Sequence, residues 1–592
     1  MPGFIAHIGK EKLAFAAETR KKLVVNHIDG NGYQLERRVV DKFMNDRLFV
    51  ETDKYLVVVE GVVVNNHDLM AQYHASSWSD CVIAMYEQEG DAFFNAFRGS
   101  FSGIFYDKQQ DKWLVYTNHI GDKQVFVYKT ADGYIFASEI GFIADTAKLN
   151  KLPLTINVIG AYMSLTFGFC IEDATLIQEV TKLCAGHYFK LQDGKLEDIQ
   201  YHRFTNKPKQ MTRQEAVEGI DKYFRQAIRR AFEKDKEYGY LHIACLSGGL
   251  DSRMTVWVAH EMGYTNQLNI TYSESGYLDF SIAQEIATDL HHDWLFKPLD
   301  GGECIKDLEQ ITPITYGQAC YLGLAHGLSM ERLINYDDFG IIHTGQLGDV
   351  VIGTYLKKMG YGQKPKINDG AYSEELRERI ETYQFKYDYE DAELFMMYNR
   401  GFCGIAQGLL TFQEKSESYS PFTDVDFFEF CYSIPLEFRF NHKIYFDWIL
   451  DCYPQAAEYV WEKLKHKITR IENRVPRTMK IFGYEVPHWT EPDFKHYMKG
   501  FVLRRLGLRK KGVKYKAPQA FTKWNMNPID YWFSVNPSLA EFTSSYYSSN
   551  ISKIEDNQLR TDIEDLFNKT TIYDTIQAIS ILSAIKKLQS HN

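Results

Sequence analysis

The chain has 592 residues, which is too long for one hydrophobic core, so we expect roughly two to four domains. Its apolar content of 45% and charged content of 24% are ordinary for a soluble globular protein, and a net charge of −11 argues against general nucleic-acid binding. No uninterrupted apolar segment reaches transmembrane length. The nine cysteines form no Cys-x-x-Cys pair, which excludes a recognisable zinc or iron–sulfur ligand set and indicates reduced thiols in a cytoplasmic protein.

The first part of the chain is predicted to be rich in strands. Short apolar runs alternate with turns there, as at residues 55–59 and 113–116. The hydrophobic period changes near residue 205. We therefore predict two domains, at residues 1–205 and 206–592.

The second part alternates helices with strands. A long helical pattern covers residues 216–232, strands are predicted at residues 240–246 and 267–272, and a helix is predicted at residues 279–290. This alternation predicts a parallel, doubly wound α/β sheet, in which ligands bind at the carboxyl ends of the strands. Beyond about residue 370 the chain is predicted to be mainly helical.

The most informative motif is Ser-Gly-Gly-Leu-Asp-Ser at residues 247–252, between a predicted strand and a helix expected to start at Arg253. A strand, a glycine-rich turn and a helix N-terminus make an anion site, because backbone N–H groups and the helix dipole favour negative charge. Asp251 suits a phosphate only when a divalent cation lies between them. A plain turn capped by aspartate is the structural alternative. The motif resembles the pyrophosphate loop of the N-type ATP pyrophosphatases.

Two later segments carry related signals. A predicted strand at residues 339–343 leads into Thr-Gly-Gln-Leu-Gly-Asp, in which Asp349 either caps a helix or shares a cation with Asp251. Residues 420–424 (Ser-Pro-Phe-Thr-Asp) are followed by an Ile-Pro pair and by Lys443, which alone would be interpreted as a solvated surface lysine.

The three segments together resemble the asparagine synthetase (glutamine-hydrolysing) family. Residues 344–355 are similar to its S-G-E-G-S-D-E-x-x-x-G-Y pattern, and residues 420–443 to its P-F-x-D, Leu-Pro and lysine pattern. The resemblance implies an N-type ATP pyrophosphatase domain (adenine nucleotide α-hydrolase-like) with a helical extension, and it implies ATP and Mg²⁺ as cofactors. It assigns Mg²⁺ to Asp251 and Asp349, and catalytic roles to Lys443 and Gln346. It assigns the ATP phosphates to Leu246, Ser247, Gly248, Gly249, Asp251, Ser252 and Gly345.

The first domain resembles the family's glutaminase domain, an Ntn-type sandwich, at residues 98–103, 121–125, 136–140 and 183–187. Two departures change the expected activity. A glutaminase of this class needs a cysteine at position 2 and a glutamate after Asn-Gly, whereas this chain has Pro2 and, in the second motif, Glu60-Gly61-Val62. We therefore expect a structural domain without glutaminase activity. Relatives of this kind include β-lactam synthetase, lasso-peptide macrolactam synthetase and asparagine-synthetase-like proteins of polysaccharide pathways.

Two residues leave the chemistry open. Gln346 stands where the family has glutamate, and an amide cannot accept a proton near neutral pH, so either the acid–base arrangement or the recognition of the amine must differ. Arg253 follows Ser252 where a small residue is usual. Binding of an acidic substrate and an ion pair on its own helix explain Arg253 equally well.

These observations predict an AMP-forming amide or lactam ligase that adenylates a small-molecule, glycan or peptide carboxylate and transfers it to ammonia or an amine, with no nucleic-acid partner. The alternatives are adenylation for another transfer, such as thiolation, and a decayed nucleotide-binding scaffold. Residues 504–516 are strongly basic, which fits a solvated face better than a contact with a membrane surface or an anionic carrier. The sequence leaves open whether the protein is a homodimer.

Overall fold

The computed structural model describes residues 3–18, 23–356, 362–470, 478–481, 484–487, 523–569 and 571–590. Two features of the sequence, Pro2 and the basic residues 504–516, lie outside the described residues. Among the described helices, none combines the length and the apolar character needed to cross a membrane.

The first part of the chain folds into two six-stranded antiparallel sheets that face each other, as expected for a strand-rich region. Residues that alternate along the strands fill the space between the sheets, such as Phe4 and Phe136 from one sheet and Val58 and Ile104 from the other. In spatial order, the first sheet contains β10 (Val180–Lys182), β8 (Phe126–Lys129), β9 (Tyr134–Ala137), β1 (Gly3–Ile8), β3 (Tyr33–Val40) and β2 (Leu23–Gly30). The second contains β12 (Lys195–Gln200), β11 (His187–Gln192), β7 (Lys112–Thr117), β6 (Gly99–Asp107), β5 (Tyr55–Val63) and β4 (Leu48–Glu51).

Helices cover the outer faces of this sandwich. The first pair, α1 (Asn66–Gln72) and α2 (Trp78–Glu89), packs on the second sheet, where Val82 and Met85 meet Val57. The second pair, α3 (Ile140–Leu149) and α4 (Val158–Phe167), packs beside the first sheet. The result is a four-layer α/β/β/α domain.

The second part contains a five-stranded sheet whose neighbouring strands are all parallel. Its spatial order is β15 (Asp293–Pro298), β14 (Gln267–Ser273), β13 (Leu241–Cys245), β16 (Phe339–His343) and β17 (Ser418–Tyr419). From β13 the chain adds β14 and β15 on one side of that strand, and it then returns to add β16 on the other side. Because the order reverses there, β13 and β16 flank the topological switch point, where ligands bind in such sheets.

Both faces of the parallel sheet are covered. Helices α5 (Arg213–Glu237), α6 (Leu250–Glu261) and α7 (Leu278–Asp289) share a core with Ala244 on one face. Ile243 points the other way, into a core with Met330 of α9 (Tyr321–Glu331). The doubly wound fold expected from the sequence is therefore confirmed.

Some element boundaries differ from those expected. Helix α5 is longer than the predicted residues 216–232, because Thr212 and Glu215 form a capping box before its apolar period begins. Helix α6 begins at Leu250 rather than at Arg253, so Asp251 and Ser252 lie in its first turn. Asp251 and Ser252 are thus positioned by a helix, whereas Ser247 lies in the turn before it.

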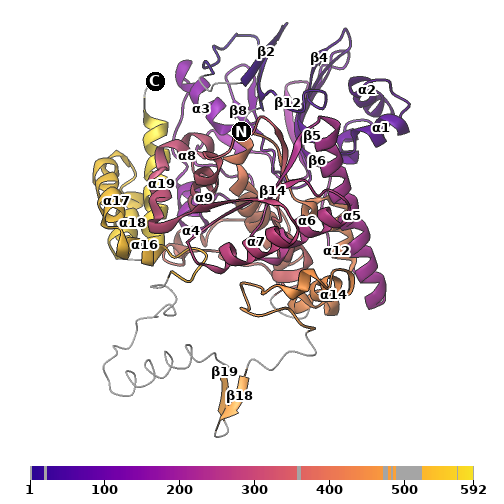
Figure 1. The fold of residues 1–592 in the computed structure, drawn as a ribbon. Coiled ribbons are helices and arrows are strands. Elements are labelled where there is room, and N and C mark those ends of the chain that lie inside the picture. Colours follow the sequence, from indigo (N-terminus) through magenta and orange to yellow (C-terminus); the bar gives the residue numbers. More distant parts are fainter. Residues whose placement is uncertain are drawn as a thin grey trace.

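The chain beyond residue 370 is mainly helical in its described part, apart from β17 and the hairpin of β18 (Thr478–Ile481) and β19 (Tyr484–Pro487). Two of its longer helices, α12 (Val425–Ser433) and α14 (Lys443–Cys452), pack against α5. Four further helices, drawn in yellow in Figure 1, are α16 (Ile529–Val535), α17 (Pro537–Asn550), α18 (Asn557–Lys569) and α19 (Ile572–Gln589). Helix α19 packs against α4, so this extension contacts the first domain as well as the second.

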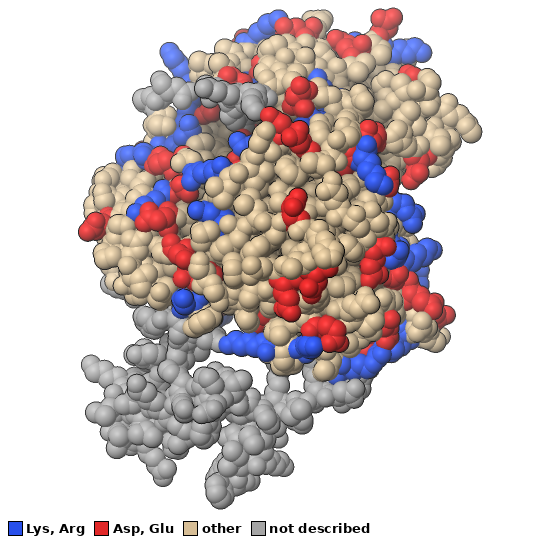
Figure 2. Space-filling model, viewed as in Figure 1, with Lys and Arg blue, Asp and Glu red and all other residues tan. Residues whose placement is uncertain are grey.

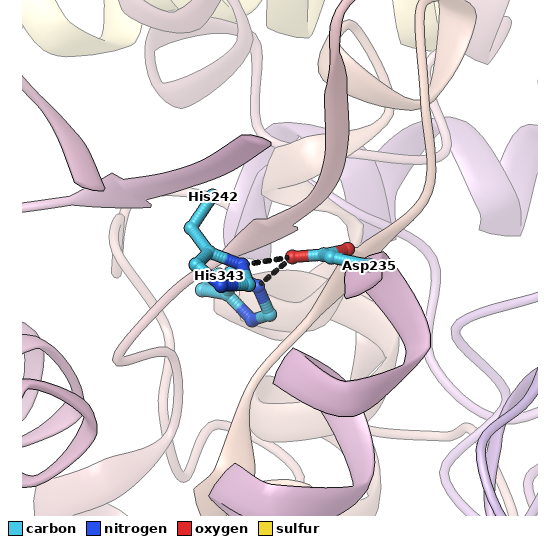
Figure 3. Close-up of side chains that lie close together, drawn as sticks. All are labelled: Asp235, His242 and His343. Atoms are coloured by element: carbon cyan, nitrogen blue, oxygen red, sulfur yellow. Dashed lines mark hydrogen bonds and ion pairs between the residues drawn. The ribbon is translucent and has the colours of Figure 1, made fainter. Parts of the chain in front are cut away.

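A buried cluster joins α5 to the two central strands (Figure 3). Asp235 Oδ2 accepts hydrogen bonds from His242 Nδ1 at 2.8 Å and from His343 Nε2 at 2.7 Å. The other oxygen accepts one from the Ile341 N–H at 2.7 Å. Two ligands of a tetrahedral zinc ion would lie about 3.3 Å apart, so these shorter distances favour hydrogen bonds over a metal site. We interpret the cluster as a brace that holds β13 and β16 against α5.

We expect Asp235→Ala to lower the free energy of unfolding by roughly 3 kcal/mol, because it leaves three buried donors without an acceptor. Thermal unfolding would measure the loss, with Asp53→Ala, at an exposed turn position, as the control. An unchanged melting temperature would contradict the brace. The cluster would be a metal site instead if the purified protein contained one metal ion per chain and a chelator lowered its melting temperature.

Candidate active site

The loops that follow β13 and β16 touch, and two glycines make this approach possible. A Cβ on Gly345 would lie 2.3 Å from the backbone nitrogen of Ser252, and one on Gly348 would lie 2.6 Å from the Asp251 carboxyl carbon. No side chain fits at such distances without displacing one of the loops. The absence of a side chain at these two positions therefore brings the two predicted motifs together.

Asp251 and Asp349 face each other at this contact. Burial, and next the negative charge of Asp349, raise the pKa of Asp251 above its usual range. The Tyr445 hydroxyl donates a hydrogen bond to Asp251 Oδ1 at 2.6 Å. Two adjacent carboxylates of this kind fit Mg²⁺, which takes oxygen ligands and commonly one or two carboxylates beside the substrate's phosphates.

The glycine-rich turn is already internally hydrogen-bonded. The backbone N–H of Ser247 donates to Ser252 Oγ at 3.0 Å, and the two hydroxyl oxygens lie 2.9 Å apart. The N–H of Gly248 donates to Asp279 Oδ1 at 2.8 Å, and that of Gly249 to Ser247 Oγ at 3.2 Å. Phosphate contacts would therefore fall on the hydroxyls and on the first-turn amides of α6. Leu246 is buried immediately after β13 and leads into this turn.

Arg253 has neither of the two roles considered from the sequence. Its guanidinium is fully buried and donates to four carbonyl oxygens, of Gly248, Ala456, Tyr459 and Val460. It is thus unavailable to an acidic substrate, and these hydrogen bonds go to backbone carbonyls rather than to a carboxylate. Arg253 instead fastens the segment after α14 to the glycine-rich turn.

Gln346 and Lys443 lie on elements that border the site. Gln346 Nε2 donates to the Ile405 carbonyl at 2.9 Å, and Ser420 Oγ donates to the Gln346 carbonyl at 2.8 Å. Gln346 therefore ties its loop to two neighbouring segments. Lys443 is the first residue of α14, two positions before Tyr445. The assignment of catalysis to Gln346 and Lys443, like that of ATP and Mg²⁺ to the other residues, stays a prediction.

One charged group at the site was missed from the sequence. Lys463 Nζ lies 4.0 Å from Asp349 Oδ2, which places a cation beside the two aspartates. Its neighbour Glu462 has its pKa raised to about 7, mainly by burial and then by the charge of Asp279. No motif marks this segment, because its position depends on the hydrogen bonds of Arg253.

In the first domain, the segment that departs from the glutaminase pattern lies in a buried network of charges. Arg47 bridges Glu60 at 2.9 Å and Glu417 at 2.5 Å, and Glu417 also pairs with Lys123 at 2.7 Å. Glu417 immediately precedes β17, so the network crosses between the domains. The two cations beside this segment, Arg47 and Lys123, are thus already paired with glutamates of the same chain.

Comparisons with known proteins agree with this architecture. Residues 39–202 match the glutamine amidotransferase domain model, and residues 219–399 match the asparagine synthase model. Asparagine synthetase B (glutamine-hydrolyzing) of Escherichia coli K12 is 22% identical over 343 residues, which cover 52% of this chain and 54% of that protein. Asparagine synthetase 2 (glutamine-hydrolyzing) of Bacillus subtilis 168 is 26% identical over 293 residues, covering 45% of this chain and 38% of that protein.

The matched regions thus span about half or less of the length of these two relatives. A solved structure of glutamine phosphoribosylpyrophosphate amidotransferase from B. subtilis covers 45% of this chain and 76% of its own, at 10% identity and with a TM-score of 0.22.

The protein combines an Ntn-type amidotransferase domain with a doubly wound asparagine synthase domain. Over these two regions it is similar to the glutamine-hydrolysing asparagine synthetases. The domain limits at residues 205 and 206 stay a prediction, although the last strand of the sandwich ends at Gln200 and α5 begins at Arg213.

We expect Gly348→Ala to weaken binding of magnesium and ATP by at least about tenfold, because the added Cβ displaces the Asp251 carboxylate. The measurement is the rise in melting temperature caused by Mg²⁺ and ATP, which reports ligand affinity for the folded state. Gly323→Ala is the matched control, since its Cβ would meet no atom within 4 Å. Equal shifts in the two variants would contradict the site.

Proposed function

We propose that the protein is an ATP-dependent, AMP-forming amide ligase that adenylates a carboxylate and transfers it to ammonia or to a substrate amine. The approach of Asp251 and Asp349 at the switch point carries this proposal. The asparagine synthase match supports an amide ligase of this type. Buried hydrogen bonds of Asp235 hold both central strands against α5, which suits a reaction that depends on preorganised charges.

The reaction begins with attack of the substrate carboxylate oxygen on the α-phosphorus of ATP. Pyrophosphate leaves, and the amine then attacks the acyl carbon and releases AMP. Bound Mg²⁺ would supply positive charge to the phosphate oxygens. We propose that the hydroxyls of Ser247 and Ser252 and the N-terminus of α6 stabilise that negative charge, since the hydroxyls lie together beside the first turn of the helix.

Two lysines border the site from different segments. Lys463 lies near Asp349, and Lys443 begins the helix that carries Tyr445. A lysine ammonium beside transferring phosphoryl oxygens stabilises charge that develops in the transition state. We propose that both contribute, Lys443 by the family resemblance and Lys463 by its position.

Lys443→Ala and Lys463→Ala are each expected to lower turnover by about 10²–10³-fold, because each removes a cation at developing charge. AMP release with a panel of amino acids, uronic acids and peptide carboxylates would measure the loss. Lys467→Ala is the control, since this exposed lysine on the same segment pairs with Glu458. Unchanged turnover in either site variant would remove that lysine from the mechanism.

The absence of glutaminase activity is part of the proposal. Val62 and the charges around Glu60 support it, since an arginine that already bridges two glutamates is poorly available to a substrate carboxylate. Pro2 supports it from the sequence, because proline carries no thiol. The first domain would then serve as a scaffold, joined to β17 through Glu417.

We expect AMP formation to depend on added ammonia or an amine, and glutamine to be neither consumed nor able to replace it. Enzymatic measurement of glutamate beside AMP would check both statements. Glutamate released in step with AMP would contradict the scaffold role while leaving the ligase in place.

The carboxylate is proposed only as a class: a small molecule, a glycan or a peptide. Figure 2 shows acidic and basic side chains mixed over most of the visible face, which supports the proposal that no nucleic acid is bound there. The oligomeric state and a contact through residues 504–516 stay predictions.

A further inference from the structure

A short chain of hydrogen bonds leads away from Asp349. The Thr354 hydroxyl lies 2.8 Å from Asp349 Oδ2 and 2.5 Å from His442 Nε2. Thr354 ends the helical turn η3 (Val350–Thr354), which follows Asp349, whereas His442 precedes α14. Two segments far apart in the sequence therefore converge on one carboxylate.

The direction of these bonds follows from the groups involved. A carboxylate only accepts hydrogen bonds, and a hydroxyl has a single proton to donate. The Thr354 proton therefore points to Asp349 Oδ2, and the hydroxyl oxygen accepts from His442. His442 must carry a proton on Nε2, which holds for one neutral tautomer and for the charged form alike.

The backbone holds His442 in this position at an energetic cost. Asn441 and His442 have φ values of +57° and +62°, in the left-handed region that non-glycine residues seldom adopt. Each costs about 1–2 kcal/mol relative to ordinary backbone. The imidazole ring also packs near Phe446 and Trp461, with ring centroids 6.0 and 6.4 Å away. Backbone and aromatic neighbours together fix the direction of Nε2.

We propose that His442 is a positioning residue that acts through Thr354 to orient the Asp349 carboxylate for a divalent cation shared with Asp251. A hydrogen bond to a ligating carboxylate fixes its rotamer, so less conformational freedom is lost when the cation binds. Asp349 needs such support because 32% of its side-chain surface is exposed to solvent, so packing alone does not fix its rotamer. The Asp251 carboxylate is instead held by the hydrogen bond from Tyr445. The inference rests on the proposed function, since it requires a cation at these aspartates.

The test is the affinity for Mn²⁺ or Mg²⁺, measured by calorimetry with a non-hydrolysable ATP analogue and hence without turnover. His442→Ala and Thr354→Val should each weaken cation affinity by about 10-fold, and the double variant should be no weaker than either single one. His442→Gln, whose amide N–H can replace Nε2, should recover most of the affinity. His442→Gly should lose affinity while keeping or raising the melting temperature, because glycine relieves the left-handed backbone.

His187→Ala is the matched control, since it removes a histidine–aspartate pair of 2.7 Å in the first domain. Its cation affinity should equal that of the unsubstituted protein. Cation affinity in the His442→Ala and Thr354→Val variants equal to that of the unsubstituted protein would overturn the positioning role of His442 and leave the proposed function in place. A glutamine variant as weak as the alanine variant would also overturn that role. Failure of the unsubstituted protein to bind any divalent cation would overturn the positioning role together with the proposed function.

Discussion

The structure depends on the contact between the loops after β13 and β16. Parallel strands end at the same edge of a sheet, but only glycine at positions 345 and 348 lets their loops approach this closely. The contact places Asp251 beside Asp349 in a half-buried position, where two negative charges repel each other. The protein accepts this unfavourable arrangement, which is typical of a site built to bind a cation.

Several buried interactions support this contact from outside the site. Asp235 holds the two central strands against α5, and Arg253 fastens the segment that carries Lys463 to the glycine-rich turn. Glu417 joins β17 to charges of the first domain. Each interaction satisfies polar groups that would otherwise be buried without partners, so each also limits how far the strands and loops can move. The first domain thereby contributes to the rigidity of the second, whether or not it has chemistry of its own.

The sequence was sufficient for the parallel, doubly wound class of the sheet and for the two motifs that meet at its edge, and insufficient for the strand order and for the supporting residues. Alternating strand and helix periods predicted the parallel sheet, and the motifs at Asp251 and Asp349 predicted two loops at one edge. The role of Arg253 was not predictable, since its four carbonyl partners come mostly from residues about 200 positions away. Lys463 and the pair of Thr354 with His442 were missed for the same reason.

The amino-acid sequence by itself determined the local features of this protein: its strands and helices, its glycine turns, the identity of its charged groups and the loss of the glutaminase signature at Val62. These follow from short-range periodicity and from the chemistry of single residues. Tertiary structure alone decided which charges face each other. Arg253 became a buried brace and Lys463 a neighbour of Asp349 because packing brought distant segments to one strand edge, and pairing over such distances leaves no periodic pattern in the chain.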